Sequence, residues 1–278
     1  MKNTIKILIK SPKFLIGFFI LLIMVIFMNI YPMVNHADPF SMIGLSFEKP
    51  SKAFFMGTDN FGRDAFLELM YAIRTSIQIG LIAGCTATAI GLFIGLVSGY
   101  VGGVIDDIMT AFTNMFIVIP SIIILILVSV SLNTRSSITI AIIIGLTSWP
   151  WTARAVRAQT SSLRNRDHVN IAKISGHSTA KIIVYEILPY IASYVVMAFV
   201  LQTASGILAE ATLSMLGLGP FNTISLGMML NWATMFEAQL SGAWWAFIPP
   251  ALAVAFITFS LYLMNTGMDE IFNPKIRS

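Results

Sequence analysis

The side chains able to do chemistry are few in this sequence and lie far apart. His36, His168 and His177 are isolated from one another and from the single cysteine, Cys85. No H-E-x-x-H spacing or mixed histidine and carboxylate cluster is present to hold a metal, and no G-x-x-x-x-G-K-[ST] loop or G-x-S-x-G nucleophile occurs. We therefore expect a chain that is not an enzyme, holds no metal or cofactor and cannot hydrolyse ATP alone.

Two acidic side chains stand where charge is unusual. Glu186 and Glu210 lie at the two ends of an uncharged stretch. Ionisable groups are costly inside a membrane, so those that occur there serve structure or function. An interfacial position with a hydrogen bond to a neighbouring helix is the simpler role for both. A substrate-binding role for Glu210, with Ser214 one turn later, is the alternative.

The composition gives the setting for these residues. Of the 278 residues, 56% are hydrophobic and 11% charged, with a mean hydropathy of +0.82. Such a chain cannot cover the surface of a water-soluble domain, and its single cysteine excludes a disulfide scaffold. The net charge of +4 fits cations kept on cytoplasmic loops better than a nucleic-acid partner. We expect an integral membrane protein.

Windows of about 20 mostly apolar residues predict membrane-spanning helices. Six such windows occur, at about 14–34, 76–98, 108–132, 137–151, 187–214 and 243–266. The first has a basic start but no small-residue cleavage site after it, so we interpret it as a retained anchor rather than a signal peptide. The prediction is an all-α membrane protein of about six transmembrane helices.

The distribution of cations orients these spans. Six spans place both termini on one side, and the side with more Lys and Arg is cytoplasmic. Twelve cations fall on the side of the N-terminus: Lys2, Lys6, Lys10, Lys13, Arg154, Arg157, Arg164, Arg166, Lys173, Lys181, Lys275 and Arg277. Five fall on the other: Lys49, Lys52, Arg63, Arg74 and Arg135. The topology is therefore N-in and C-in.

Two connections are too long to be simple turns, and we expect them to carry recognition. They are the outer residues 35–75 and the inner residues 152–186. No repeat or low-complexity tract separates soluble domains, so residues 1–278 form a single transmembrane domain. In the second span a ridge of small side chains recurs every four residues and predicts close helix packing, within the chain or against another membrane subunit. Its members are Ala83, Ala87, Gly91, Gly95 and Gly99.

The inner connection is basic and contains a short predicted helix at 169–174. Ala172 and Gly176 lie four residues apart, so this helix would offer a nearly bare patch on which a partner's backbone can settle. A solvated loop is the alternative. The segment resembles the cytoplasmic E-A-A-x-x-x-G-x9-I-x-L-P signature of binding-protein-dependent ABC importer permeases. The matching positions are Ala172, Gly176, Leu188 and Pro189.

Three further stretches resemble the dipeptide, oligopeptide and nickel branch of that family, specifically its second, C-type permease subunit. GTDNFGRD at 57–64 is similar to its G-T-D-x-x-G-R-D, and EATLSMLGLG at 210–219 to its E-A-x-L-S-F-L-G-L-G. The end, residues 268–274, is similar to its L-R-D-x-x-D-P without the arginine. These landmarks cover most of the chain in the order and spacing of that branch.

The resemblance implies a type I ABC importer permease fold, with an N-terminal anchor helix at about 14–34 and a permease core at about 70–270. It implies a bacterial or archaeal cell membrane location and half of a translocation path, to which Glu210 and Ser214 contribute as candidates. The implied partners are a second homologous permease, two ABC ATPases and an extracytoplasmic substrate-binding protein. ATP and Mg would bind only on the ATPases.

The resemblance also assigns sites. Contact with an ATPase through a coupling helix is implied for Asp167, Asn170, Ile171, Ala172, Gly176, Leu188 and Pro189. Asn170 replaces the family's glutamate, so docking there would depend on packing, hydrogen bonds and Asp167. An outer gate or receptor rim is implied for Gly57, Thr58, Asp59, Gly62, Arg63 and Asp64. Residues 66–73 after it would form an apolar helix face on the membrane surface, and a calcium site at Asp59 and Asp64 is a minor alternative.

The substrate stays open at this point. Dipeptides and oligopeptides are the first reading, and nickel or a metal chelate carried by the same machinery is the alternative. A self-sufficient secondary carrier should show intramembrane ionisable relays and inverted repeats, and neither is found in the sequence. A membrane assembly or anchoring protein without transport is a further alternative. Scattered methionines are treated as packing residues.

Overall fold

A computed structural model describes residues 11–131 and 136–272. Within these ranges the chain is helical and contains no named strand, so the predicted all-α class is confirmed. The elements in chain order are α2 (Pro12–Val34), α3 (Ala65–Val101), α4 (Gly103–Val118), α5 (Ser121–Ser131), α6 (Ser137–Leu163), α7 (Asp167–Ile174), α8 (Thr179–Ile182), the π-helical η1 (Ile183–Ile187), α9 (Leu188–Leu213), the π-helical η2 (Ser214–Leu218), α10 (Leu226–Met235) and α11 (Trp244–Phe272). Lys2, Lys6, Lys10, Arg135, Lys275, Arg277 and the end of the closing motif at 273–274 lie outside the described residues.

The helices match the predicted spans in position, but one predicted span is broken into two helices and another is not apolar over its full length. Among the described residues, four helices are long and apolar enough to cross a membrane, namely α2, α3, the continuous stretch Thr179–Leu218 and α11, and the pair α4 and α5 makes a fifth if it counts as one span. The predicted count of six is not reached by this measure, because α6 becomes polar after Leu146. The predicted third span is two helices bent by 82°, because Pro120 has no N–H to continue the α4 ladder.

Helix α3 begins at the outer segment, defined here as residues 35–64. The Asp64 side chain accepts hydrogen bonds from Phe66 N and Leu67 N at 2.9 and 3.2 Å, which satisfies two amides of the first turn. The predicted apolar face at 66–73 was expected on the membrane surface, and that expectation is wrong. Leu69, Met70 and Ile73 are buried against α9, α10 and α11 in the main core, because the helix continues without a break into the span.

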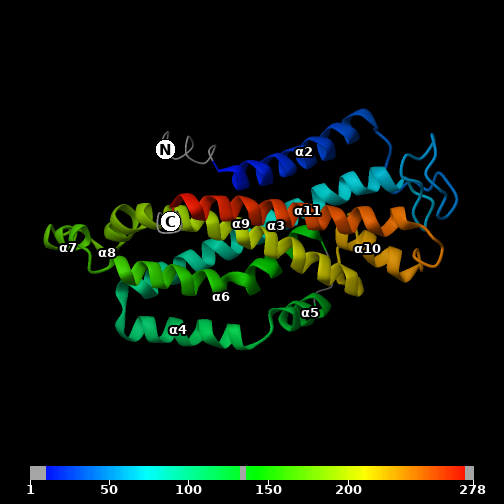
Figure 1. Ribbon diagram of the computed structural model, residues 1–278. Helices are drawn as coiled ribbons and strands as arrows, with labels where there is room; N and C mark the ends of the chain where they lie inside the picture. The colour runs from blue at the N-terminus through cyan, green and yellow to red at the C-terminus, as the bar shows by residue number, and fades with distance from the viewer. Residues whose placement is uncertain (1–10, 132–135, 273–278) are drawn as a thin grey trace.

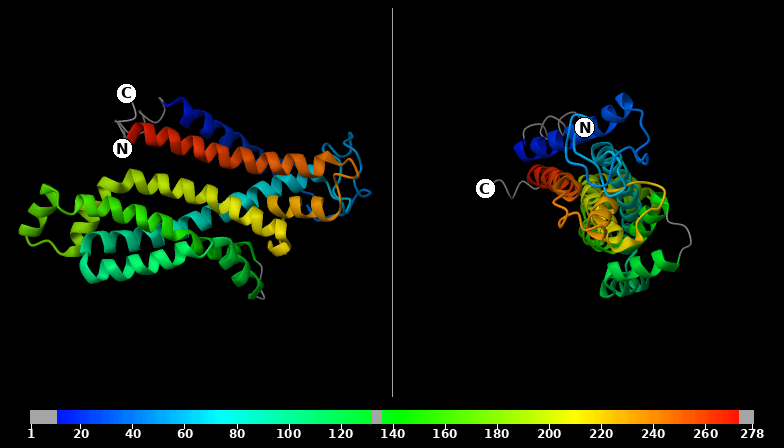
Figure 2. Two further views of the ribbon diagram at one scale, coloured as in Figure 1. Left: turned by 60° about the horizontal axis from the view of Figure 1, so that its bottom comes forward. Right: turned by 90° about the vertical axis from the view of Figure 1, so that its right-hand side faces the viewer.

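The bundle is layered around α3 (Figure 1). Helices α2 and α11 pack together on one side of it, α6 and α9 pack directly on it, and α4 and α5 lie beyond α6 on the other side. Both views in Figure 2 agree with this order. The start of α2, the end of α11 and α7 lie at one end of the bundle, and the outer segment lies at the opposite end. This arrangement fits termini that share one side of the membrane.

The small-residue ridge of α3 packs against α6 within this chain. A Cβ at Gly91 would lie 2.6 Å from Thr152 Cβ, and one at Gly95 would lie 2.7 Å from the Ala153 carbonyl oxygen. Gly99 is similarly crowded by the next turn of α6. Because the two backbones approach so closely, glycine is required there. Ala83 and Ala87 complete the ridge and are buried.

Candidate functional site

The outer segment folds as a compact cap on the end of the bundle. The buried Thr58 hydroxyl donates to Leu45 O and accepts from Glu48 N at 2.6 and 2.8 Å, and Thr58 O accepts from the indole of Trp245 at 2.9 Å. Gly57 and Gly62 have φ of +72° and +76°, a conformation that favours glycine. The G-T-D-x-x-G-R-D residues are therefore brought together, and Trp245 ties them to α11.

A buried ion pair lies beneath this cap. Arg63 Nη1 donates to Glu68 Oε1 at 3.3 Å, and the two side chains are 10% and 1% exposed. The guanidinium of Arg63 also lies 4.3 Å from the ring centre of Phe61 and 5.1 Å from that of Trp232 on α10. Because aromatic faces attract cations, these rings offset part of the hydration free energy that Arg63 loses on burial. Sequence reasoning missed Glu68, which is separated from the motif by three residues.

Asp59 lies beside this pair. Its Oδ1 accepts from Phe61 N and Arg63 N, both at 2.8 Å, and burial raises the pKa of its carboxyl above the ordinary value. Both Asp59 and Asp64 thus use an oxygen on backbone amides, and no group of three or more His, Cys, Asp or Glu able to hold a metal occurs within 11–131 and 136–272. The arrangement orders the cap.

Glu210 is fully buried near the outer end of α9. Its carboxylate accepts hydrogen bonds from the hydroxyls of Ser214 and Ser225, both at 2.6 Å, and of Ser76 at 3.2 Å. Ser76 Oγ in turn accepts from Leu226 N at the start of α10. These contacts join α3, α9 and α10, and they give Glu210 the hydrogen-bonded position that was the simpler of the two roles predicted for it. Glu210 and Ser214 lie outside the lining of the groove that opens at the break between α4 and α5.

A groove of about 460 Å³, which we call the central groove, opens at the level of the α4–α5 break. Its walls come from that break, the middle of α6, the middle of α9 and one side chain of α11. The lining residues are Phe116, Ile117, Ile119, Pro120, Ser121, Thr147, Ser148, Pro150, Trp151, Leu201, Gln202, Ser205 and Tyr262. None of these side chains is charged, and several are hydroxyl or amide groups. Sequence reasoning did not single out Gln202, Ser205 or Tyr262, because one polar residue in an apolar helix gives no periodic signal.

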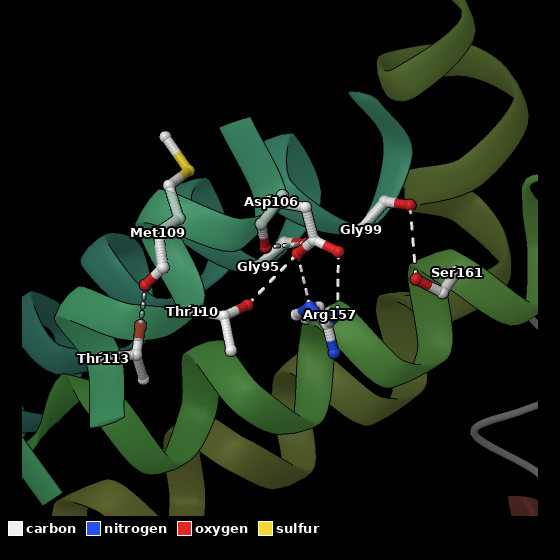
Figure 3. A network of polar contacts seen from close by, with 9 residues as sticks. Gly95, Gly99, Asp106, Met109, Thr110, Thr113, Arg157 and Ser161 are labelled. Atoms are coloured by element: carbon white, nitrogen blue, oxygen red, sulfur yellow. Dashed lines mark hydrogen bonds and ion pairs between the residues drawn. The ribbon is translucent and has the colours of Figure 1, made fainter. Parts of the chain in front are cut away.

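Two arginines one turn apart on α6 hold α4 beside the groove, and Figure 3 shows one of them, Arg157, paired with Asp106. Arg157 Nη2 donates to Asp106 Oδ2 at 2.7 Å, and Arg154 Nη2 donates to Asn114 Oδ1 at 2.9 Å. A second cavity of about 180 Å³ lies between these residues and α3. Helix α4 is therefore attached to α6 through these polar contacts and through Phe112 and Phe116, whose rings pack on Trp149.

The inner segment, residues 164–187, projects from the bundle (Figure 1). The predicted helix is present as α7. The expected bare patch is wrong for Ala172, which is 5% exposed because it packs inward with Val169, Ile182 and Ile187. Gly176 is open, with φ of +75° and no atom within 4 Å of a built Cβ.

The outward face of α7 is instead apolar at its C-terminal end. Ile171 and Ile174 are 64% and 87% exposed, and Asn170 is also exposed. Asp167 lies in the first turn of α7, exposed, and does not pair with Asn170, whose amide donates to Asn165 O at 3.2 Å. Leu188 and Pro189 form the first turn of α9, where Leu188 packs against the buried cluster that holds Val169 and Ala172 rather than on the outward face of α7. The structure brings Asn170, Ile171 and Gly176 to one exposed region and separates Leu188 and Pro189 from it.

Several apolar helices, an uncharged groove between them and an exposed inner helix are the features expected of a membrane transport component. Residues 91–278 match the model of the binding-protein-dependent transport system inner membrane component family. The chain is 30% identical over 99% of its length to a putative peptide transport system permease protein of Brucella suis, covering 92% of that protein. It is 31% identical over 96% of its length to the dipeptide transport system permease protein DppC of Bacillus subtilis, covering 83% of it. It is also 30% identical over 79% of its length to the oligopeptide permease OppC of Lactococcus lactis, covering 75% of it.

The chain belongs to the family of binding-protein-dependent transport system inner membrane components. The resemblance inferred from the motifs is confirmed, as is a multi-pass membrane location. As a transport component of this family it works within a complex that contains other subunits.

Proposed function

We propose that this chain is a permease subunit of an ATP-driven importer of dipeptides or oligopeptides and forms half of its translocation path. The observation that carries this proposal is the similarity, over almost the whole chain, to permeases named for peptide and dipeptide transport. The central groove supports it, because an uncharged lining of hydroxyl, amide and aromatic groups suits a neutral main chain.

The same groove argues against nickel or a metal chelate as the substrate. Metal ions are held by carboxylate, imidazole and sulfur ligands, and the groove lining includes no Asp, Glu, His, Cys or Met. A proton-coupled carrier is also disfavoured, because Glu210 is enclosed by three serine hydroxyls and reaches no groove-lining residue.

The driving force would come from two ABC ATPases, which bind ATP and Mg, with a second homologous permease and an extracytoplasmic substrate-binding protein completing the complex. The exposed Ile171 and Ile174 support an ATPase contact at α7, because large apolar side chains on an aqueous segment mark a binding surface. Residues Asn170 and Gly176 border this surface. Residues 57–64 are largely buried, so a receptor at the other end would contact the rest of the outer segment, which these residues hold in place.

Reconstitution in liposomes tests the proposal. The complex is purified through a tag on this chain, and uptake of labelled peptide is measured with receptor outside and ATP inside. We expect uptake that requires ATP, receptor and all membrane subunits, and no uptake of nickel ions. Peptide flux by this chain alone, or ATP-dependent uptake of nickel without peptide uptake, would overturn the proposal.

A further inference from the structure

We propose that Gln202 is a substrate-positioning residue whose side-chain carbonyl accepts a hydrogen bond from a main-chain N–H of a peptide in the central groove. This inference rests on the proposed function as a peptide importer. It goes further by naming the group on this chain that recognises the substrate and the substrate atom that it recognises.

The orientation of the Gln202 amide is fixed by α6. Its Nε2 donates to Ser148 O at 3.0 Å and to Thr152 Oγ1 at 2.8 Å. The Ser148 carbonyl only accepts, so the nitrogen of the amide must face it. Both N–H groups are used in these two bonds, which prevents the side chain from turning over. The carbonyl oxygen Oε1 therefore points away from α6.

That oxygen is left for a ligand. Gln202 is 5% exposed and lines the central groove. Its Oε1 accepts no hydrogen bond from the described residues, and it is not among their buried unpaired atoms, so its remaining exposure is towards the groove. An acceptor held rigid from behind loses little entropy when a donor arrives. By contrast, the Thr147 hydroxyl on the same wall is already bonded to carbonyls of its own helix.

The neighbouring break between α4 and α5 indicates that the groove holds water. Helix α4 ends at Val118, Ile119 is extended, and α5 starts after Pro120. Irregular backbone at membrane depth is tolerated where it is enclosed by protein or lines a water-filled space. Ile119, Pro120 and Ser121 all line the groove. A polar substrate can therefore enter this site without losing all of its hydration.

A peptide main chain is the ligand that these groups fit. Every peptide carries N–H donors at regular spacing, so a fixed carbonyl acceptor binds peptides regardless of their side chains. The hydroxyls of Ser148 and Ser205 can accept from or donate to the same main chain, and Trp151 and Tyr262 offer flat apolar contact for side chains. The uncharged lining adds no preference for acidic or basic peptides.

Backbone N-methylation tests the inference, because it replaces one main-chain N–H by N–CH3 and leaves the side chains unchanged; the Gln202→Met variant controls for the added methyl group and its effect on the cis form. The complete importer in liposomes is given receptor saturated with a neutral tripeptide, trialanine, or with analogues methylated at one amide, and uptake per loaded receptor is measured. We expect methylation of one amide to lower uptake by the wild-type importer about threefold to tenfold, the value of one hydrogen bond. The Gln202→Met variant, which has no acceptor, should carry the methylated and unmethylated peptides at equal rates.

Matched variants separate recognition from packing. Thr147→Val removes a hydroxyl on the same wall that is already bonded to carbonyls of its own helix, and it should retain the wild-type preference. Gln202→Asn keeps the carbonyl and the NH2 of the amide but shortens the side chain by one methylene, so its acceptor no longer reaches the peptide. It should lose most of the preference, and it can be measured even if Gln202→Met fails to assemble. If the wild type takes up unmethylated trialanine and every methylated analogue equally, or if both Gln202 variants keep the full preference for the unmethylated peptide, the inference is overturned while peptide import itself stands. A wild-type importer that carries no peptide would instead overturn the proposed function.

Discussion

The two ends of this molecule are built in opposite ways. In the outer segment, polar side chains are buried: Thr58 is 0% and Asp59 6% exposed, and the indole of Trp245 from α11 donates to Thr58 O. In the inner segment, apolar side chains face outward, with Ile174 87% exposed. The outer end encloses its polar groups within this chain, although Asp59 Oδ2, Arg63 Nε and Glu68 Oε2 have no hydrogen-bond partner among the described residues. The inner end has a surface that, in water, is satisfied only by a partner.

This difference indicates that the outer segment contributes to the stability of the fold, whereas α7 couples the bundle to a partner. A cap stabilised by its own ion pair, glycines and aromatic rings keeps its shape whether or not a receptor is present. A short helix, attached through Val169 and Ala172 and apolar on its outward side, can carry the motion of a partner into α6 and α9. Changes in the outer segment should therefore affect folding, and changes on the outward face of α7 should affect assembly.

The largest expected effect comes from breaking the Arg63–Glu68 pair. Glu68→Leu removes the carboxylate partner of the buried Arg63, and it should destabilise the protein by about 3–5 kcal/mol. The apparent unfolding temperature in detergent measures this. Glu270→Gln breaks the exposed Lys13–Glu270 pair and should cost less than about 1 kcal/mol. Equal losses in the two variants would show that the cap is not a stability centre.

Two glycines with the same backbone conformation give the next comparison. Gly57 and Gly176 have φ of +72° and +75°, but a Cβ at Gly57 would contact the Glu48 carbonyl and Trp245, whereas one at Gly176 meets nothing within 4 Å. Gly176→Ala should cost about 1–2 kcal/mol from the left-handed conformation alone. Gly57→Ala should cost about 1–3 kcal/mol more from overpacking. Thermal unfolding of both variants checks this, and a larger loss at Gly176 would contradict it.

Removing an apolar side chain from the outward face of α7 should affect assembly more than folding. Ile174→Ser should change the free energy of unfolding by less than about 0.5 kcal/mol, because the side chain is exposed in this chain. It should weaken ATPase binding about tenfold or more, since burial of an isoleucine contributes about 1.5–3 kcal/mol. Co-purification at graded salt and detergent measures the binding. Lys181→Ser on α8 serves as the control for a merely exposed position, because this side chain makes no hydrogen bond or ion pair with the described residues.

The smallest expected effect is a pH dependence at Asp59. Burial raises its pKa in the folded state, so the folded protein holds this proton more tightly than the unfolded chain does. Its contribution to stability is therefore fully present below the ordinary carboxyl pKa of about 4 and is lost as the pH rises through the raised value. Asp59→Asn keeps an oxygen acceptor for Phe61 N and Arg63 N. The unfolding temperature of that variant should fall less with pH above about 4 than that of the wild type, and parallel curves would contradict this.

The sequence predicts the helices far better than it predicts the contacts between them. Apolar length located every span, and the spacing of Ala83 to Gly99 correctly indicated close packing, which the structure assigns to α6. A helix after Asp64 was predicted, but its continuation into the second span was missed because the apolar window begins only at Ser76. The break at Pro120 has a sequence signal in the proline itself, which a hydropathy window ignores.

The site residues were harder to predict for a physical reason. The direction of Ala172 depends on the rotation of α7 relative to Ile182 and Ile187, and spacing alone does not fix that rotation. The central groove combines residues 116–121, 147–151 and 201–205 with Tyr262, which meet only through tertiary packing. Glu68 joins Arg63 because the cap folds back over α3. The order and spacing of residues along the chain do not predict the orientation of Ala172, the lining of the central groove or the pairing of Glu68 with Arg63.

Cross-linking of α7 tests the central claim most directly. Ile174→Cys in a Cys85→Ser background provides a single thiol on the outward face of α7, and the complex is treated with a short bifunctional reagent in membranes of known orientation. We predict a cross-link to an ABC ATPase subunit, formed from the cytoplasmic side and lost when the ATPases are stripped away. Labelling of this thiol by an impermeant reagent from outside the cell, with no ATPase adduct, would contradict the account.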